Sequence, residues 1–363
     1  MFALNGWYVP FDLAIYLDAG DQVLAGRSPY ADAAFVATGD YVYPPPLAVA
    51  ITPLSALPDR YAATLWTLAG IGAIVLALVL LGVRDRRCFV LALLFPYTIE
   101  TLKYGEPGSF LLLLVAVLWR YRDAAATAGA AVAGALALKL FLWPVIPWLA
   151  FTRRWRAVAY AVFGATVLIL GSWAVIGFRG LADYPELLRR FAEIESHHSY
   201  SAVAVVRALG LPASVAQAVV LAAGTVLLAL AWRAARRGAD EPGERDRRSL
   251  TLVLAAALVL TPIVWQHYLA LLVAPIALAR PRLSPLWALP LAAWPLYAFD
   301  WYDDWHRGDL APLLSTLLFV SLVFVFSLRR PDLDLDRQQE REPAPALDLA
   351  AVAAPQRHPD VPA

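Results

Sequence analysis

A series of long apolar segments runs through most of this 363-residue sequence. An α-helix needs about 20 predominantly apolar residues to cross the hydrocarbon core of a bilayer. In lipid, a helix satisfies its own backbone hydrogen bonds. We therefore expect an all-α, polytopic integral membrane protein. The candidate spans lie roughly at 61–83, 88–102, 109–119 with its flanks, 157–178, 211–232, 250–265, 267–279, 284–298 and 311–328.

Two further apolar stretches are interrupted. The stretch 124–152 contains Lys139, Pro144 and Pro147, so we expect two short or re-entrant helices there. The stretch 44–58 carries five prolines and is too short to span, which favours an interfacial or re-entrant piece. With the short and re-entrant pieces included, the sequence predicts about 10–12 membrane helices.

The composition excludes several classes of protein. Charged residues make up 16% of the chain and hydrophobic residues 60%, whereas soluble domains have about 25% charged residues. This balance excludes a cytosolic enzyme, a secreted disulfide-rich domain and a nucleic-acid-binding protein with a basic face. Cys88 is the only cysteine, so neither an intrachain disulfide nor a cysteine metal cluster is possible. Arginine almost entirely replaces lysine and alanine is abundant, which suggests a GC-rich, actinobacterial-like genome.

The arginines predict the orientation of the chain in the cell membrane. Cytoplasmic loops are enriched in Lys and Arg. We therefore place on the cytoplasmic side the basic stretches 84–87, 120–122, 153–156, 233–248, 280–282 and 329–330. The loops expected outside are 1–43, 103–108, 179–210 and 299–310. We expect one membrane domain over 1–328 and a disordered cytoplasmic tail over 329–363, because the tail is rich in Pro, Asp and Arg and has no apolar period.

Asp12 is the first candidate for chemistry. It is the single carboxylate in the apolar run 11–16 of the external loop. An ionisable group next to hydrocarbon is costly and is a functional candidate for that reason. Partial burial would also raise its pKa toward that of a useful general base. The structural alternative is that Asp12 caps the start of a helix.

Short runs along the chain carry a resemblance to a known family. In order, they are Phe11-Asp12-Leu13-Ala14-Ile15-Tyr16, Ala25-Gly26-Arg27-Ser28-Pro29-Tyr30, Tyr43-Pro44-Pro45, Lys103-Tyr104-Gly105-Glu106-Pro107, Lys139-Leu140-Phe141-Leu142-Trp143-Pro144 with the basic turn 153–156, Ser199-Tyr200 through Arg207, and Thr261-Pro262-Ile263-Val264-Trp265-Gln266-His267-Tyr268. Together, from about residue 10 to about residue 280, they resemble glycosyltransferase family 87. These are GT-C-type α-mannosyltransferases that use polyprenyl-phosphate mannose.

The sequence departs from the family in two places: Glu106 replaces the usual glutamine, and no apolar span precedes Asp12. We expect either an external amino terminus or a missing initial helix.

The resemblance implies a GT-C-type helical bundle and transfer of mannose to a lipid-linked glycan or lipoglycan on the external face. A lipid phosphate leaving group needs charge compensation, and the acceptor hydroxyl needs a base. We expect Asp12 to be that base, with inversion at the sugar carbon. The expected phosphate partners are Lys139, Arg27 and Arg207. The expected substrate-binding residues are Tyr16, Tyr43, Glu106, Trp265 and His267.

Several of these side chains also have a structural explanation. Lys139 could extend to the membrane interface, and Trp265 with Tyr268 could belong to an interfacial aromatic belt. Tyr16, Tyr30, Tyr41, Tyr43, Trp301, Tyr302 and Trp305 are expected on the outer face, either stacking on sugars or anchoring the interface. Asp303-Asp304 stands next to Trp305 and His306 and is interpreted as a feature of the rim, and His197-His198 lack carboxylates at ligand spacing. The resemblance implies neither a metal nor another cofactor, because GT-C enzymes that use monophosphate donors usually need no metal clamp for a nucleotide diphosphate.

Other functions stay open at this point. The chain could be a different GT-C transferase, for example of arabinose or glucose. It could be a transporter, although we find no internal repeat of the kind that transporters carry. It could also be an inactive relative. The partners common to the transferase interpretations are a polyprenyl-phosphate sugar and a lipid-linked or glycan acceptor, with no nucleic acid.

Overall fold

The computed structural model describes residues 3–4, 7–30, 40–196, 199–237, 241–295 and 310–329. These residues are helical apart from loops and one small antiparallel hairpin of β1 (Ala3–Leu4) and β2 (Trp7–Tyr8), so the expected all-α class is confirmed. The helices, with 3-10 helices marked η, are α1 (Phe11–Leu24), α2 (Pro45–Ser55), α3 (Asp59–Leu80), α4 (Arg86–Leu94), α5 (Pro96–Tyr104), α6 (Gly108–Arg120), α7 (Ala125–Leu138), η1 (Leu140–Leu142), α8 (Val145–Phe151), α9 (Trp155–Val175), α10 (Tyr184–Glu195), α11 (Ala202–Ala208), α12 (Ala213–Arg236), α13 (Pro242–Leu260), η3 (Gln266–Leu272), α14 (Val273–Ala279), α15 (Pro285–Ala288), η4 (Leu289–Ala293) and α17 (Leu310–Leu328).

Four helices of the described residues are long and apolar enough to cross a membrane, namely α3, α9, α12 and α17. A fifth span forms if α5 and α6 are one crossing, although they are bent by 118° at their break. Shorter apolar helices lie at 125–138, 140–151 and 266–279. The chain is thus a multi-pass membrane protein, and most of the 10–12 expected membrane helices are short or broken rather than full spans.

Prolines explain why two of the expected membrane spans are divided or shortened. The segment 88–102 divides into α4 and α5 because Pro96 is the first residue of α5, and Phe95 before it is extended at φ −60° and ψ 125°. The segment 250–265 ends its helix at Leu260, just before Thr261 and Pro262. The expectation of two short helices in 124–152 is confirmed by α7 and α8.

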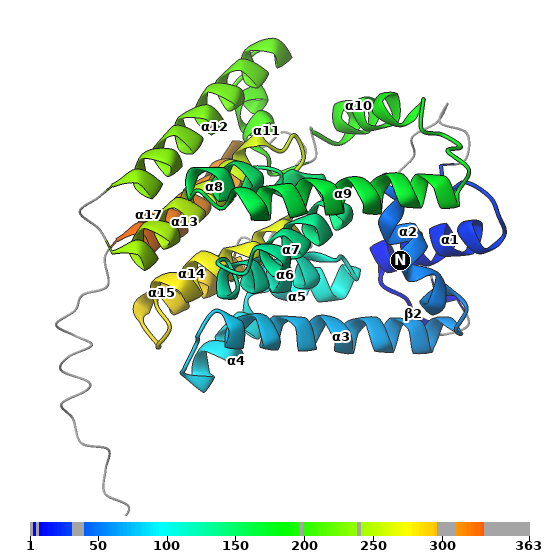
Figure 1. Cartoon of the computed structure of the whole chain (residues 1–363), viewed down its shortest axis with the longest axis horizontal. Coiled ribbons are helices and arrows are strands. Elements are labelled where there is room, and N and C mark those ends of the chain that lie inside the picture. The colour runs from blue at the N-terminus through cyan, green and yellow to red at the C-terminus, as the bar shows by residue number, and fades with distance from the viewer. Residues whose placement is uncertain are drawn as a thin grey trace, which may run out of the picture. The chain divides into compact units, whose positions relative to one another are not determined.

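The centre of the bundle is built from small residues. Figure 1 shows α5, α6 and α7 between α3 on one side and α9 on the other. At Gly129 of α7, an added Cβ would come within 2.4 Å of the Tyr160 Cβ and 2.9 Å of the Ala157 carbonyl oxygen on α9. Small residues allow backbones to approach this closely where helices associate in lipid. The outward faces are apolar, with Phe163 of α9 70% exposed and Leu68 of α3 61% exposed, as lipid contact requires.

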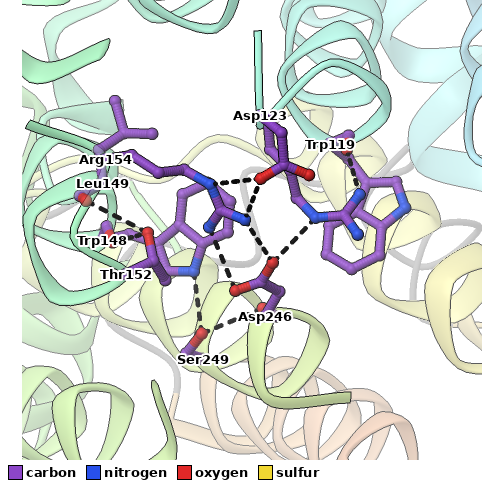
Figure 2. Close-up of polar contacts among 9 residues, drawn as sticks. Trp119, Asp123, Trp148, Leu149, Thr152, Arg154, Asp246 and Ser249 are labelled. Carbon is purple, nitrogen blue, oxygen red and sulfur yellow. Dashed lines mark hydrogen bonds and ion pairs between the residues drawn. The ribbon is translucent and has the colours of Figure 1, made fainter. Parts of the chain in front are cut away.

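A cluster of polar and charged side chains joins the ends of four helices (Figure 2). Asp246 of α13 accepts hydrogen bonds from Arg122, after α6, at 2.9 Å and from Arg154, before α9, at 2.7 Å. Arg154 also pairs with Asp123 at 2.7 Å. Below the carboxylate, the Trp148 indole donates to Ser249 Oγ at 2.9 Å. This cluster fixes the ends of α6, α8, α9 and α13 relative to one another.

Replacing Asp246 with Ala should destabilise the protein by about 2–4 kcal/mol. Removing one partner of a buried charge pair leaves the other charge uncompensated, and partial solvent access to both arginines reduces that cost. Thermal unfolding of the purified protein in detergent measures the effect. Glu193→Ala is the control, because Glu193 pairs with Arg189 on an exposed face of α10. Equal melting temperatures for both variants would contradict the structural role of Asp246.

Three of the tyrosines that were expected to stack on sugars or to anchor the interface are buried in the protein. Tyr16, Tyr30 and Tyr41 are 0%, 8% and 5% exposed. Tyr30 stacks on Trp173 of α9 with ring centroids 5.0 Å apart, and its hydroxyl donates to the Tyr43 carbonyl at 2.7 Å. Aromatic pairs of this geometry stabilise a core beyond the area they bury. These rings therefore hold the amino-terminal segment against α9; Trp301, Tyr302 and Trp305 lie outside the described residues.

Candidate functional site

A cavity of about 580 Å³ opens at the ends of α1, α5, α7 and α13. The distance along α13 from Asp246 to Leu260, which lines the cavity, is about 20 Å at the helical rise of 1.5 Å per residue. The cavity and the charged cluster of Figure 2 therefore lie toward opposite ends of α13. The acidic, basic and histidine side chains that line the cavity are Asp12, Asp40, Glu100, Lys139, Glu195 and His267. Its remaining walls are mostly apolar and aromatic.

Asp12 lies in the first turn of α1 and lines the cavity. The N-cap residue of α1 is Pro10, so the helix-cap explanation for Asp12 is wrong. Leu13 and Tyr16 are fully buried and fix the rotation of α1 about its axis. Burial, together with the charges of Glu106 and Glu100, raises the pKa of Asp12 to about 7 against the opposing effect of Lys139. This value suits a general base at neutral pH.

A tight turn at Gly105 supports the start of α1. Gly105 ends α5 in the left-handed conformation, at φ 72°. A Cβ on Gly105 would lie 2.7 Å from the Leu13 Cβ and 2.8 Å from the Pro10 Cβ. The indole of Trp66 on α3 donates to the Gly105 carbonyl at 2.8 Å. The motif at 103–107 thus holds the residues on both sides of Asp12.

Gly105→Ala should lower stability by about 2–4 kcal/mol, because it combines left-handed strain with overpacking against α1. Displacement of Asp12 should also lower the turnover number by up to about 100-fold. Gly82→Ala is the matched control: Gly82 has φ 82°, but nothing lies within 4 Å of its added Cβ. Thermal unfolding and transfer assays on both variants measure the difference. If the two variants behaved alike, the contact with α1 would have no role.

A buried ion pair lies next to Asp12. Lys139 separates α7 from η1 with an extended backbone at φ −149°, and its Nζ lies 2.6 Å from Oε1 of Glu106. The side chains of Lys139 and Glu106 are 3% and 1% exposed. Oε2 of Glu106 accepts from the Gly108 backbone N–H at 2.7 Å, at the start of α6. Lys139 lines the cavity, whereas Glu106 lies behind it.

Aromatic rings complete the surroundings of Lys139. Its ammonium lies 3.5 Å from the centroid of the Tyr268 ring and 5.2 Å from that of Tyr43. Tyr268 in turn stacks on Phe141 at 5.1 Å. Such cation–π contacts help to hold a desolvated cation in place.

His267 enters the cavity from η3. Thr101 Oγ1 donates to the His267 carbonyl oxygen at 3.0 Å, which ties η3 to α5. Nε2 of His267 is buried and has no hydrogen-bond partner within the described part of the chain. A buried polar atom without a partner is costly, so a substrate oxygen is a suitable partner for it. The neighbouring Gln266 donates to the Tyr200 hydroxyl at 3.0 Å and closes one wall.

The structure brings together most of the residues that the sequence singled out. Asp12, Tyr43, Lys139, Trp265 and His267 all line the cavity. Glu106 and Tyr16 are buried directly behind the lining. Tyr16 packs edge-on against Tyr43, with centroids 5.1 Å apart.

The two arginines that were expected to bind the donor phosphate lie outside the cavity. Arg27 is exposed after α1 and donates to Gln22 Oε1 at 2.6 Å. Arg207 lies in the last turn of α11. Neither lines the cavity, where Lys139 is the only lysine or arginine among the described lining residues.

Sequence reasoning missed Glu100 and the role of Tyr268. Glu100 lies within a stretch that reads as one apolar span, yet it is 8% exposed and lines the cavity. The available signal was a carboxylate inside an apolar segment, the same signal that identified Asp12. Tyr268 was interpreted as an interface anchor, and its ring instead contacts Lys139.

No group of three or more His, Cys, Asp or Glu side chains suited to a metal ion occurs among the described residues. The pairs His197-His198 and Asp303-Asp304 lie outside those residues, as does the tail expected to be disordered, except for Arg329. Comparison with known proteins gives one match. The model of glycosyltransferase family 87 matches residues 41–262. No curated protein and no solved structure matches the chain.

Proposed function

Because the chain belongs to glycosyltransferase family 87, we propose that this membrane glycosyltransferase moves mannose from polyprenyl-phosphate mannose to a lipid-linked glycan or lipoglycan. The observation that carries the proposal is Asp12, a half-buried carboxylate in a cavity that Lys139 and His267 also line. The family match favours a transferase over the transporter alternative. The acidic and aromatic residues around the cavity, opposite the arginine-rich end, support a site on the external face.

The proposed reaction is a single displacement. The acceptor hydroxyl gives its proton to the Asp12 carboxylate while its oxygen attacks the anomeric carbon of the donor. The bond from that carbon to the phosphate oxygen breaks, and polyprenyl phosphate leaves with the electron pair. Attack from the face opposite the phosphate inverts the sugar carbon. The charge on the leaving phosphate is stabilised where cations and hydrogen-bond donors face it.

We propose that two further side chains, Lys139 and His267, assist the reaction. The Lys139 ammonium is the positive charge of the lining, and a lysine interacts with phosphate as a compact cation. Nε2 of His267 would exchange a hydrogen bond with a sugar or phosphate oxygen, or orient Asp12. The apolar residues of α10 that line the cavity, among them Leu188 and Phe191, would cover the lipid portion of a substrate.

The test is an assay of membranes that contain the protein. Membranes are incubated with radiolabelled polyprenyl-phosphate mannose, and the lipid extract is examined for a new labelled product. Parallel reactions with polyprenyl-phosphate glucose and polyprenyl-phosphate arabinose separate mannose from the other sugars. A labelled product from the glucose or the arabinose donor, with none from the mannose donor, would overturn the choice of mannose but still support a glycosyltransferase. No product from any donor would count against the proposed reaction.

A further inference from the structure

The Glu106–Lys139 ion pair lies beside Asp12, the proposed base. Lys139 lines the cavity, whereas Glu106 is buried behind it. We propose that Glu106 is a positioning residue that holds the Lys139 ammonium at the cavity and keeps Asp12 able to accept a proton at neutral pH. This inference rests on the proposed function, in which Asp12 is the base. It replaces the expectation that Glu106 contacts substrate.

The geometry gives Glu106 two fixed partners. One carboxylate oxygen lies 2.6 Å from Lys139 Nζ, and the other accepts from the Gly108 N–H at 2.7 Å. A Cβ on Gly108 would approach that second oxygen to 2.5 Å, so the carboxylate rests directly on the start of α6. With both oxygens engaged and the side chain 1% exposed, Glu106 has one orientation and no access to substrate.

The charges around Asp12 explain why this pair affects the base. The groups that face Asp12 electrostatically are the carboxylates of Glu106 and Glu100, the ammonium of Lys139 and the phenols of Tyr16, Tyr43 and Tyr268. An unpaired ammonium would favour the ionised Asp12 and make it a weak base. Glu106 offsets that ammonium, and its own charge opposes ionisation of Asp12. A glutamine at this position would do neither.

Glu106→Gln tests the charge with little change of shape. The amide oxygen can still accept from Gly108 N–H, so the turn is retained. Loss of the negative charge should lower the pH at which Asp12 ionises by about 1 unit, which is the size of a charge effect across a partly buried site. In the wild type, transfer should rise with pH through about 7, because only the ionised carboxylate accepts a proton. In Glu106→Gln, this acidic limb should move down by the same amount.

Two measurements on the full chain in lipid nanodiscs decide the matter. The first is the pH profile of kcat/KM for the wild type and Glu106→Gln. The second is an infrared titration of the protonated Asp12 carboxyl group, measured without substrate in the wild type and in Glu106→Gln. The Asp12 band is assigned by its loss in Asp12→Asn for the wild type, and by its loss in Asp12→Asn/Glu106→Gln for Glu106→Gln. Glu193→Gln, on the exposed face of α10, should leave both unchanged. Lys139→Met/Glu106→Gln, which removes the cation as well, should return the infrared titration toward the wild-type value.

A downward shift in Glu106→Gln, with the partial return in the double variant, supports the proposal. An unchanged infrared titration of Asp12 in Glu106→Gln overturns it, even if activity falls, because a purely structural role lowers activity at every pH. An equal shift in Glu193→Gln also overturns it. If the wild type transferred no sugar, the proposed function would fail, and the infrared titration would still decide whether Glu106 sets the proton affinity of Asp12.

Discussion

Replacing Asp12 with Asn should lower the turnover number for sugar transfer by about 10²–10⁴-fold, which is the contribution of a general base to a reaction of this kind. The amide has nearly the same shape as the carboxylate but cannot take the acceptor proton. Asp12 is half-buried with a pKa of about 7, so the variant removes a group that is costly to ionise. Folding should therefore survive. The measurement is single-turnover transfer of labelled sugar by the purified variant.

Asp18→Asn is the matched control, since Asp18 lies on the same helix and is exposed. It should transfer sugar at the wild-type rate. A normal elution volume on size exclusion for both variants excludes misfolding as the cause. Near-normal turnover in Asp12→Asn would remove Asp12 from the mechanism, and the acceptor would need another base.

The second large effect concerns Lys139. Lys139→Met removes one partner of a buried ion pair and leaves the Glu106 charge, 1% exposed, without its counterion. Breaking such a pair costs about 3–5 kcal/mol, mostly as the penalty of an uncompensated buried charge. We expect a large drop in melting temperature and a loss of transfer. Thermal unfolding in detergent, followed by transfer assays on the folded fraction, measures both.

A double variant separates folding from phosphate binding. Lys139→Met/Glu106→Gln carries no unpaired charge, so it should recover most of the lost stability. If Lys139 binds the donor phosphate, this variant should fold yet keep a raised KM for the donor. A wild-type KM in the double variant would overturn the phosphate role of Lys139. Lys103→Met is the control, because Lys103 is the only other lysine and does not line the cavity.

Much of the site was accessible from sequence because ionisable groups in apolar surroundings are costly and rarely occur without a function. Asp12 and Lys139 each interrupt an apolar run, and both line the cavity. The same argument applied to Glu100 would have found a third member. Arginines in loops and at helix ends give no comparable signal, because they are common there. Arg27 and Arg207 were chosen on such weak evidence, and neither lines the cavity.

The sequence by itself determined that this chain is a multi-pass helical membrane protein. The free energy of moving a helix into lipid is a sum over about 20 residues that are consecutive in the chain, so it can be judged without the tertiary structure. It also indicated the family, and it singled out Asp12, which lines the cavity. Only the tertiary structure decided that Lys139 pairs with Glu106, that the tyrosines form a core, and that proline-broken segments end at a shared cavity. These contacts depend on how the helices cross and where the side chains point, to a precision finer than the length of a hydrogen bond. The apolar pattern does not specify positions that closely.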